Sequence, residues 1–180
     1  MEHWFTSDTH FCHANIIKYC NRPFKDIQEH DEMLIRNWNA RVKQEDHVYH
    51  LGDFAFRNKA AAASIRNRLM GKIFFIQGNH DAAAREIKHM FSSYDKVSEI
   101  EIDGQGIFLS HYAHRVWNKS HHGVWHLYGH SHGTLPDDPN SLSFDVGVDC
   151  HGYKPISFAE VKAIMAQKSF KPVDHHTGAK

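Results

Sequence analysis

Residues 3–10 read HWFTSDTH, a short run typical of a β-strand that ends in two polar residues two positions apart. The aromatic and hydroxyl-bearing residues of His3–Ser7 predict a strand, and Asp8 and His10 follow its carboxyl end. Four more strand-like runs end in the same way, with aspartate, asparagine or histidine directly after the run. They are 47-HVYHLGD-53, 72-KIFFIQGNHD-81, 106-GIFLSH-111 and 124-VWHLYGHSH-132.

Strand-like and helix-like segments alternate along the chain. The strands are predicted at His3–Ser7, His47–Leu51, Lys72–Gln77, Val97–Ile102, Gly106–Ser110, Val124–Tyr128 and Ser143–Val148. The helices are predicted at Ala14–Cys20, Ile27–Val42, Lys59–Met70, Ala82–Met90 and Phe158–Gln167. A turn at residues 103–106 joins the fourth and fifth strands as a hairpin. This order predicts an α/β fold with one mixed sheet or two stacked sheets.

Capping signals mark several of these helices. Asp26 and Ser157 each precede a helical pattern and have glutamate, Glu29 or Glu160, three residues later, which is typical of a capping box. Gly71 is expected to stop the alanine-rich third helix.

Length and composition predict one globular domain. The 180 residues are 41% hydrophobic and 23% charged, which excludes a disordered or collagen-like chain. We expect one catalytic domain over 1–170 and a polar tail over 171–180. No apolar run approaches the roughly 20 residues of a membrane helix, and no secretory signal is evident. Three cysteines favour a reducing compartment, so a cytoplasmic protein without a membrane partner is expected.

Charge and histidine content narrow the function further. Lysine and arginine number 21, as do aspartate and glutamate, so a protein that coats nucleic acid is disfavoured. Eighteen of the 180 residues are histidine, the commonest metal ligand and the commonest general acid or base.

The polar residues after the five strands form a candidate metal centre. In open α/β sheets, ligands bind beyond the carboxyl ends of the strands, so these side chains are expected to converge. Because alternate residues of an extended segment point the same way, Asp8 and His10 can hold one ion together, and His130 and His132 can face one site. The candidate ligands are Asp8, His10, Asp53, Asn79, His111, His130 and His132. Glycines 52, 78 and 129 permit unusual dihedrals and close approach just before three of them.

Seven ligands suit two ions, with Asp53 as the bridge. Imidazole, carboxylate and amide donors without a thiolate favour two divalent transition-metal ions, Mn²⁺ first and Fe, Zn or Ni as alternatives. Two such ions and a bridging hydroxide would outweigh the two carboxylates, leaving a positive site that attracts phosphate. Such a centre is suited to hydrolysis of a phosphate ester.

These five blocks, in this order, resemble the calcineurin-like metallophosphoesterase superfamily, and especially its short bacterial and phage members. The resemblance extends over roughly Phe5 to Asp149 and implies two stacked mixed sheets flanked by helices. It also implies that one ion is held by Asp8, His10, Asp53 and His132. The other would be held by Asp53, Asn79, His111 and His130.

The same resemblance makes His80 a catalytic residue that contacts phosphate and protonates the leaving group. Asp81 beside it is expected to orient the ring. Cys12 departs from the family pattern, which often has glycine there. This residue could stiffen the loop or bring a thiol near the metals.

Other residues have open roles. For phosphate binding, Arg57 is preferred over Arg22 and Arg115, with solvent exposure or a structural ion pair as the alternative. Tyr112, Trp117 and Trp125 could stack on an aromatic group of the substrate, although burial is favoured for Trp125. A hydrogen bond to a ligand is favoured for His13 and His114 over contact with substrate.

The predicted function is hydrolysis of phosphomonoesters or phosphodiesters at an open site. A small ester, including a nucleotide, is the expected substrate. A nuclease and a non-catalytic metal-binding interaction scaffold are the alternatives. Nothing in the sequence indicates the oligomeric state.

Overall fold

The computed structural model describes residues 1–173, which contain two β-sheets. The larger sheet has the order β4-β3-β2-β1-β9. Its strands are β1 (His3–Thr6), β2 (His47–His50), β3 (Lys72–Ile76), β4 (Ser93–Asp95) and β9 (Ile156–Ser157). The first four are parallel and β9 is antiparallel, so the carboxyl ends of β1, β2 and β3 lie at one edge.

The smaller sheet has the order β5-β6-β7-β8. Its strands are β5 (Val97–Ile102), β6 (Gln105–Ser110), β7 (Trp125–Tyr128) and β8 (Ser143–Asp145). The first two form the predicted hairpin, whose turn residues Asp103 and Gly104 both have positive φ, 51° and 77°. The other neighbouring pairs are parallel, so this sheet is mixed as well.

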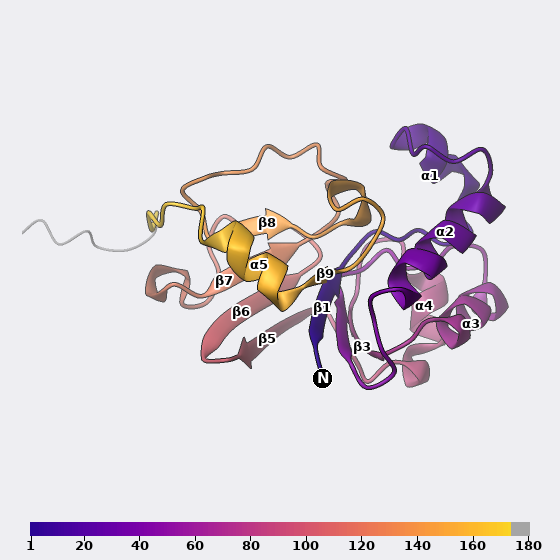
Figure 1. The fold of residues 1–180 in the computed structure, drawn as a ribbon, viewed down its shortest axis with the longest axis horizontal. Coiled ribbons are helices and arrows are strands. Elements are labelled where there is room, and N and C mark those ends of the chain that lie inside the picture. The colour runs from indigo at the N-terminus through magenta and orange to yellow at the C-terminus, as the bar shows by residue number, and fades with distance from the viewer. Residues whose placement is uncertain (174–180) are drawn as a thin grey trace, which may run out of the picture.

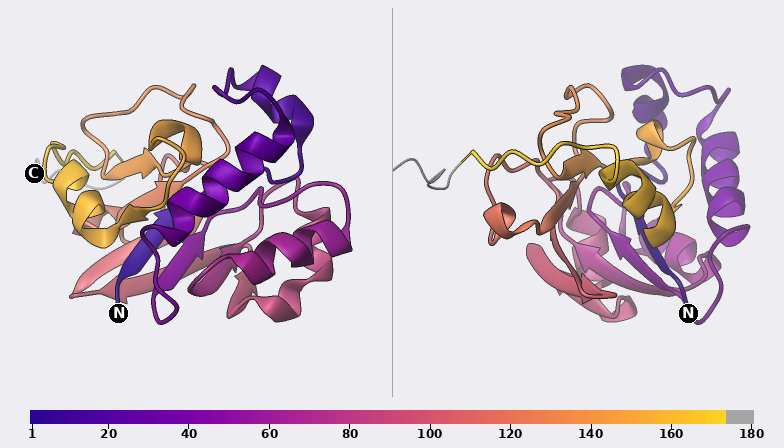
Figure 2. Two further views of the ribbon diagram at one scale, coloured as in Figure 1. Left: turned by 45° about the vertical axis from the view of Figure 1, so that its right-hand side comes forward. Right: turned by 60° about the vertical axis from the view of Figure 1, so that its left-hand side comes forward.

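Three helices cover one face of the larger sheet, on the side away from β5–β8 (Figures 1 and 2). They are α2 (Ile27–Asn39), α3 (Lys59–Arg68) and α4 (Ala82–Glu86). The short helix α1 (Ala14–Tyr19) lies beside α2, and α5 (Phe158–Met165) follows β9. Short 3-10 turns lie at Lys88–Met90, Ser120–His122 and Val148–Cys150.

Alternation along the strands divides the apolar residues between two cores. In β1, Trp4 packs in the helix-side core and Phe5 packs in the core between the sheets. Val48 and Tyr49 in β2 divide in the same way. The two sheets are therefore stacked through one shared core, and the carboxyl ends of their central strands lie near one another.

The smaller sheet has a second buried face. Leu127 of β7 lies in the core between the sheets, so its neighbours His126 and Tyr128 point to the opposite side. There His126 packs against His114 and Trp117, from the segment that follows β6. Both ring nitrogens of His126 are used, one by the Phe108 carbonyl and one by the His114 amide.

All seven predicted strands are present, and the two added strands have only two or three residues. Strands β4 and β9 were missed because so short a run has no readable alternation. Strand β8 ends at Asp145, not Val148, because Gly147 leaves it to pair with Ser7.

The helix predictions are confirmed in position, with shorter ends. The predicted fourth helix divides into α4 and the 3-10 turn Lys88–Met90. The third helix ends at Arg68, where extended Leu69 is the C-cap, so Gly71 is not its stop signal. The Ser157 capping box is complete. Asp26 also caps its helix, but the Glu29 carboxylate bonds the amide of Lys25.

Within residues 1–173, the structure contains no helix that is both long and apolar enough to span a membrane. The three cysteines, Cys12, Cys20 and Cys150, are all free thiols. Of the predicted tail 171–180, residues 174–180 lie outside the described part of the chain.

The buried His126 predicts a specific pH dependence of stability. Burial lowers its pKa from 6.5 to about 4. Between these values the unfolded chain takes up a proton that the folded chain does not, so stability falls as pH falls. We expect this residue to contribute up to about 3 kcal/mol to the loss of unfolding free energy.

Urea unfolding in a chelator at pH 7 and pH 4.5 checks the contribution of this histidine. His126→Gln is expected to reduce the pH dependence, whereas His89→Gln, at an exposed position, should leave it unchanged. Equal pH dependence in wild type and His126→Gln would contradict the assignment.

Candidate metal centre

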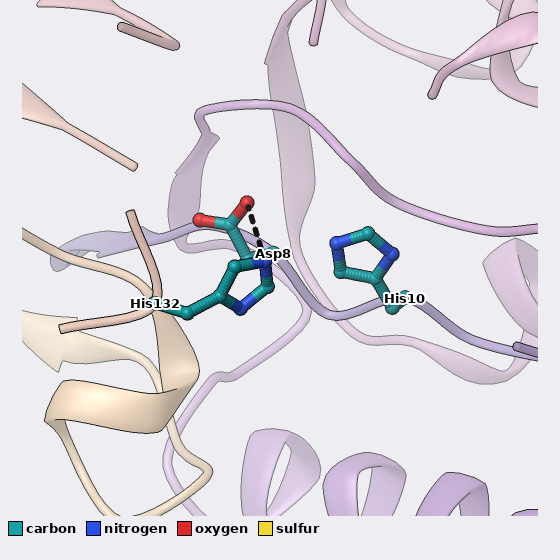
Figure 3. Close-up of side chains that lie close together, drawn as sticks. All are labelled: Asp8, His10 and His132. Atoms are coloured by element: carbon teal, nitrogen blue, oxygen red, sulfur yellow. Dashed lines mark ion pairs between the residues drawn. The ribbon is translucent and has the colours of Figure 1, made fainter. Parts of the chain in front are cut away.

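The predicted ligands gather at the carboxyl ends of the strands. One group contains Asp8, His10 and His132, which offer donor atoms within 4.8 Å of one another. Figure 3 shows Asp8 and His10 extending from the same loop, with His132 reaching them from a separate segment. A second group, with the same spacing limit, contains Asp53, His111 and His130.

Asp53 lies between the two groups. Its Oδ2 is 3.5 Å from His10 Nε2 and 3.7 Å from His111 Nε2. Its Oδ1 accepts a hydrogen bond from the His80 amide at 2.9 Å, which fixes the carboxylate. One carboxylate oxygen therefore faces a histidine of each group.

Asn79 lies beside the second group. Its Oδ1 is 3.0 Å from His111 Nε2. The structure thus brings all seven predicted ligands together.

The backbone that carries these ligands is strained. Five of the seven have the left-handed conformation that non-glycine residues rarely adopt. They are Asp8 (φ 57°), His10 (φ 49°), Asp53 (φ 57°), His130 (φ 69°) and His132 (φ 47°). These segments are not extended as expected, because the chain turns at each of the five residues. Asp8 and His10 still lie in one group, as expected, and His130 and His132 lie in different groups, as the family resemblance implies. Such strain persists only where surrounding contacts impose it, and it is common at functional sites.

The glycines that precede three of the candidate ligands allow the unusual dihedrals and the close approach that the sequence predicts. Gly52 has φ 97°. A Cβ on Gly78 would lie 2.3 Å from Asp53 Oδ1, and one on Gly129 would lie 2.1 Å from Ser7 Oγ. Only a residue without a side chain lets these loops approach so closely.

Hydrogen bonds assign the ring nitrogens that face the site. His111 Nδ1 lies 2.7 Å from the Leu51 carbonyl, and His132 Nδ1 lies 2.7 Å from Asp149 Oδ2. Both partners are acceptors, so each Nδ1 carries a proton and each Nε2 is the atom left for the site. His111 Nε2 faces Asn79 Oδ1 and His132 Nε2 faces Asp8 Oδ1, and a cation bound between the atoms of such a pair would stabilise the arrangement.

Two buried atoms of the first group also lack a hydrogen-bond partner. They are Asp8 Oδ1 and His10 Nε2. Burial raises the pKa of Asp8 and Asp53, and lowers the pKa of His10 and, to about 4, of His111. Buried carboxylates and neutral imidazoles with free lone pairs are suitable ligands for divalent cations.

Asp149 was missed by the sequence analysis. Burial alone would lower the pKa of His132, but hydrogen bonds with Asp149 and Cys20 and the charge of Asp8 raise it to about 10. A bound cation would take the position that this proton occupies. Asp149 also forms a close group with Cys20 and His132. The sequence could have indicated Asp149, because this residue comes shortly after β8, just as the candidate ligands come shortly after other strands.

Arg22 is a structural residue, not the phosphate-binding residue considered above. Its buried guanidinium forms two hydrogen bonds to Asp149, 2.8 and 2.7 Å long. It also donates to the backbone carbonyls of Asp8 and Thr9 and to His30 Nε2. Arg22 therefore fixes the first ligand loop to the carboxylate that orients His132.

Asp81 also differs from expectation. Its buried carboxylate accepts hydrogen bonds from the amides of Asp53, Phe54 and Gly78, at 2.8, 2.8 and 2.6 Å. These bonds occupy both oxygens, so Asp81 positions the Asp53 loop and does not orient His80.

His80 is exposed beside the first group. Its ring centroid lies 5.9 Å from that of His10 and 5.2 Å from that of Phe56. Phe56 also stacks on His13 at 3.8 Å, and His13 Nδ1 lies 3.3 Å from His10 Nδ1. The expected hydrogen bond from His13 to a ligand is therefore present.

The remaining candidates lie around the site. Arg57 and Arg115 are exposed, and the exposed Tyr112 ring contacts His130 at 4.7 Å. Trp117 is buried and donates to the Val124 carbonyl, so its ring edge is fixed. Trp125 is half-buried against the core between the sheets, as expected.

The His114 ring packs against Phe108 and His126, and its amide donates to His126 Nε2, so the expected hydrogen bond to a candidate ligand is not seen within residues 1–173. The Cys12 amide donates to Asp31, and burial raises the pKa of the Cys12 thiol to about 11.

Comparison with known proteins places this arrangement in a family. Residues 1–144 match the calcineurin-like phosphoesterase superfamily domain. The uncharacterized protein MJ1445 of Methanocaldococcus jannaschii is 39% identical over 161 residues, covering 86% of this chain and 85% of that protein. The gene 66 protein of Mycobacterium phage L5 is 25% identical over 181 residues, covering 83% and 87%.

Two solved structures are similar in fold. The protein of unknown function AQ665 from Aquifex aeolicus has a TM-score of 0.71 and 26% identity, over 91% of this chain and 98% of that one. A structure described as a novel archaeal phosphodiesterase has a TM-score of 0.50 and 21% identity, over 82% and 84%. The latter shows a shared fold.

The contact between Asp149 and His132 predicts an effect on metal affinity. Asp149→Asn removes the charge that favours a cation at His132 and is expected to lower affinity for one ion about 10- to 100-fold. Equilibrium dialysis with Mn²⁺ measures this loss. Asp103→Asn, in the β5–β6 turn, is the control. Unchanged affinity for every bound ion in Asp149→Asn would refute the role given to Asp149.

Proposed function

The chain belongs to the calcineurin-like phosphoesterase superfamily, and from this membership we propose that it hydrolyses phosphomonoesters or phosphodiesters at a centre of two divalent metal ions. The observation that carries the proposal is the position of Asp53, whose Oδ2 faces His10 on one side and His111 on the other. A single carboxylate oxygen placed in this way is suited to bridging two cations.

The proposed ion sites follow the two groups. Asp8, His10, His132 and Asp53 would hold one ion, and Asp53, Asn79, His111 and His130 would hold the other. When bound, two such ions supply positive charge for the phosphoryl oxygens and a hydroxide nucleophile at neutral pH. The mixed oxygen and nitrogen donors favour Mn²⁺, with Fe, Zn and Ni as the alternatives.

His80 is the proposed proton donor to the leaving oxygen. Its backbone amide is held by Asp53 Oδ1, while its ring remains exposed and packs against Phe56. This arrangement fixes the residue beside the ligands without using its ring nitrogens as ligands. A ring placed there can contact a phosphoryl oxygen and transfer a proton to the departing group.

A small phosphate ester, including a nucleotide, is the proposed substrate. Asn79, His80 and His130 are exposed, so the second group is accessible from solvent. The balanced charge of the chain disfavours a nuclease. A metal-binding scaffold without activity is disfavoured because Asn79 and His80 are both present. The cytoplasmic location stays a prediction.

Turnover assays test the activity. The protein is reconstituted separately with Mn²⁺, Fe²⁺, Zn²⁺ and Ni²⁺ and assayed with p-nitrophenyl phosphate, bis-p-nitrophenyl phosphate and nucleotides. Metal-dependent release of product is expected. Metal binding without turnover on any ester would favour the scaffold.

The position of Asp53 predicts the metal content. Two ions per chain are expected at saturation, and Asp53→Asn should weaken both sites together because the shared negative charge is lost. Asp46→Asn is a matched control, since Asp46 and Asp53 are each 2% exposed and lie at opposite ends of β2. Elemental analysis and dialysis give the measurement. One ion at saturation, or two at wild-type affinity in Asp53→Asn, would contradict the bridge.

The role of His80 predicts a dependence on the leaving group. A p-nitrophenolate anion departs without a proton, whereas an alkoxide requires one. His80→Ala is therefore expected to keep its metals but lose about 10²- to 10⁴-fold in kcat on alkyl esters, and far less on p-nitrophenyl esters.

His89→Ala, at another exposed histidine, provides the control for His80→Ala. Equal losses on both ester types would limit His80 to binding of the phosphoryl group. No loss on either would remove it from the mechanism.

A further inference from the structure

A cavity of about 570 Å³ is lined in part by the segments that follow β6 and β7, which also carry His111, His130 and His132. One wall comes from Ala113 to Ser120, directly after His111 and Tyr112. Another comes from Leu135 to Ser143, shortly after His132. Phe170 to Val173 form a third wall. None of these residues belongs to either ligand group.

Hydrogen bonds between distant segments hold the cavity in shape. The Ser169 amide donates to the Pro139 carbonyl at 2.7 Å, and the Lys171 amide donates to the Asn140 carbonyl at 3.1 Å. Lys168 Nζ contacts both oxygens of Asp137, at 2.6 and 2.7 Å. Residues 168–171 are thus bound to the loop between His132 and β8, so two of the walls form one unit.

The cavity has an aromatic floor and an apolar rim. Trp117 and Tyr128 are buried and line it. Leu135, Phe170 and Val173 line it as well and are 44%, 43% and 64% exposed. Three exposed large apolar side chains around one cavity are unusual on a folded surface, and they favour an apolar or aromatic occupant.

Polar groups lie among these apolar walls. Asp138, Asn140 and Ser143 bring donors and acceptors, and Arg115 and Lys171 bring positive charge. An alkyl chain would leave these polar groups without partners, whereas a heterocyclic base with a sugar could use them. The volume is in the range of small-molecule sites.

Residues that line the cavity are close in sequence to residues of the candidate metal centre. Tyr112, which immediately precedes its first wall, contacts the rings of His111 at 5.0 Å and His130 at 4.7 Å. Tyr128, on its floor, is two residues before His130. A ligand that occupies the cavity is therefore bound by the same loops that position the second ligand group.

We propose that this cavity binds the nucleoside part of a phosphate ester whose phosphoryl group lies at the metal centre. The inference rests on the proposed function and specifies its substrate class. The aromatic floor accommodates the base, the polar groups of the loop 138–143 hydrogen-bond its edge or the sugar, and Arg115 and Lys171 favour an anionic ligand.

Competition assays compare two phosphates that differ only in the organic group. The Ki of AMP and the Ki of methyl phosphate are measured against hydrolysis of methyl p-nitrophenyl phosphate. AMP is expected to bind at least about 10-fold more tightly, as base stacking and burial imply.

Two cavity variants and one matched control complete the design. Phe170→Ala removes part of the rim, and Ala113→Trp fills the cavity. Each should reduce the preference for AMP to less than about 3-fold while leaving the Ki of methyl phosphate unchanged. Met70→Ala is the control, because Met70 is 42% exposed, like Phe170, but lies outside the cavity.

A binding measurement separates this inference from the proposed function. Calorimetric titration with adenosine requires no turnover and should give binding to wild type and Met70→Ala but not to Ala113→Trp. If no ester is hydrolysed, the proposed function fails, and adenosine binding still decides the inference. Absence of adenosine binding, or an AMP preference that survives both cavity variants, would overturn it.

Discussion

The rest of the site depends on two carboxylates, Asp8 and Asp53, buried at the ends of parallel strands. Among residues 1–173, no lysine or arginine forms an ion pair with either one. In this part of the chain their ion-pair partners are the histidines His10, His111 and His132, whose Nε2 atoms face the same space. Burial of such charge is costly unless a cation compensates it. A metal centre is the arrangement that satisfies this requirement.

A second layer of residues maintains that arrangement. Arg22 joins the backbone of Asp8 to Asp149, and Asp149 orients His132. Asp81 performs the corresponding task for the Asp53 loop by accepting three amides. Left-handed backbone at five ligands is tolerated because these buried bonds impose it. Three charged side chains therefore hold in shape the loops that carry most of the candidate ligands.

The two sheets contribute differently to recognition. The larger sheet supplies Asp8, His10 and Asp53 from loops that are hydrogen-bonded to one another. The smaller sheet supplies His111, His130 and His132 from the connections that follow β6 and β7, which also form two walls of the cavity. Because the same connections carry ligands and cavity residues, differences in their length or sequence would change the substrate while preserving the metal centre.

The amino-acid sequence by itself was enough to predict seven strands, the positions of the helices and the seven candidate ligands that lie together, because each of these residues comes shortly after a strand. Asp81 was expected to orient His80 but holds the Asp53 loop, and Asp149 was missed. For Arg22, a structural ion pair was one of two open alternatives. Several contacts of these residues join distant positions, as Asp81 with Asp53 over 28 residues, Asp149 with His132 over 17 and Arg22 with Asp149 over 127. Sequence spacing carries no signal for such contacts. Strand alternation alone did not separate His130 from His132, whereas the family resemblance assigned them to different ions. The left-handed dihedrals of both residues are visible only in the structure. Only tertiary packing decided the cavity, because its walls come from three segments, two of which are joined by backbone hydrogen bonds that depend on no side-chain pattern.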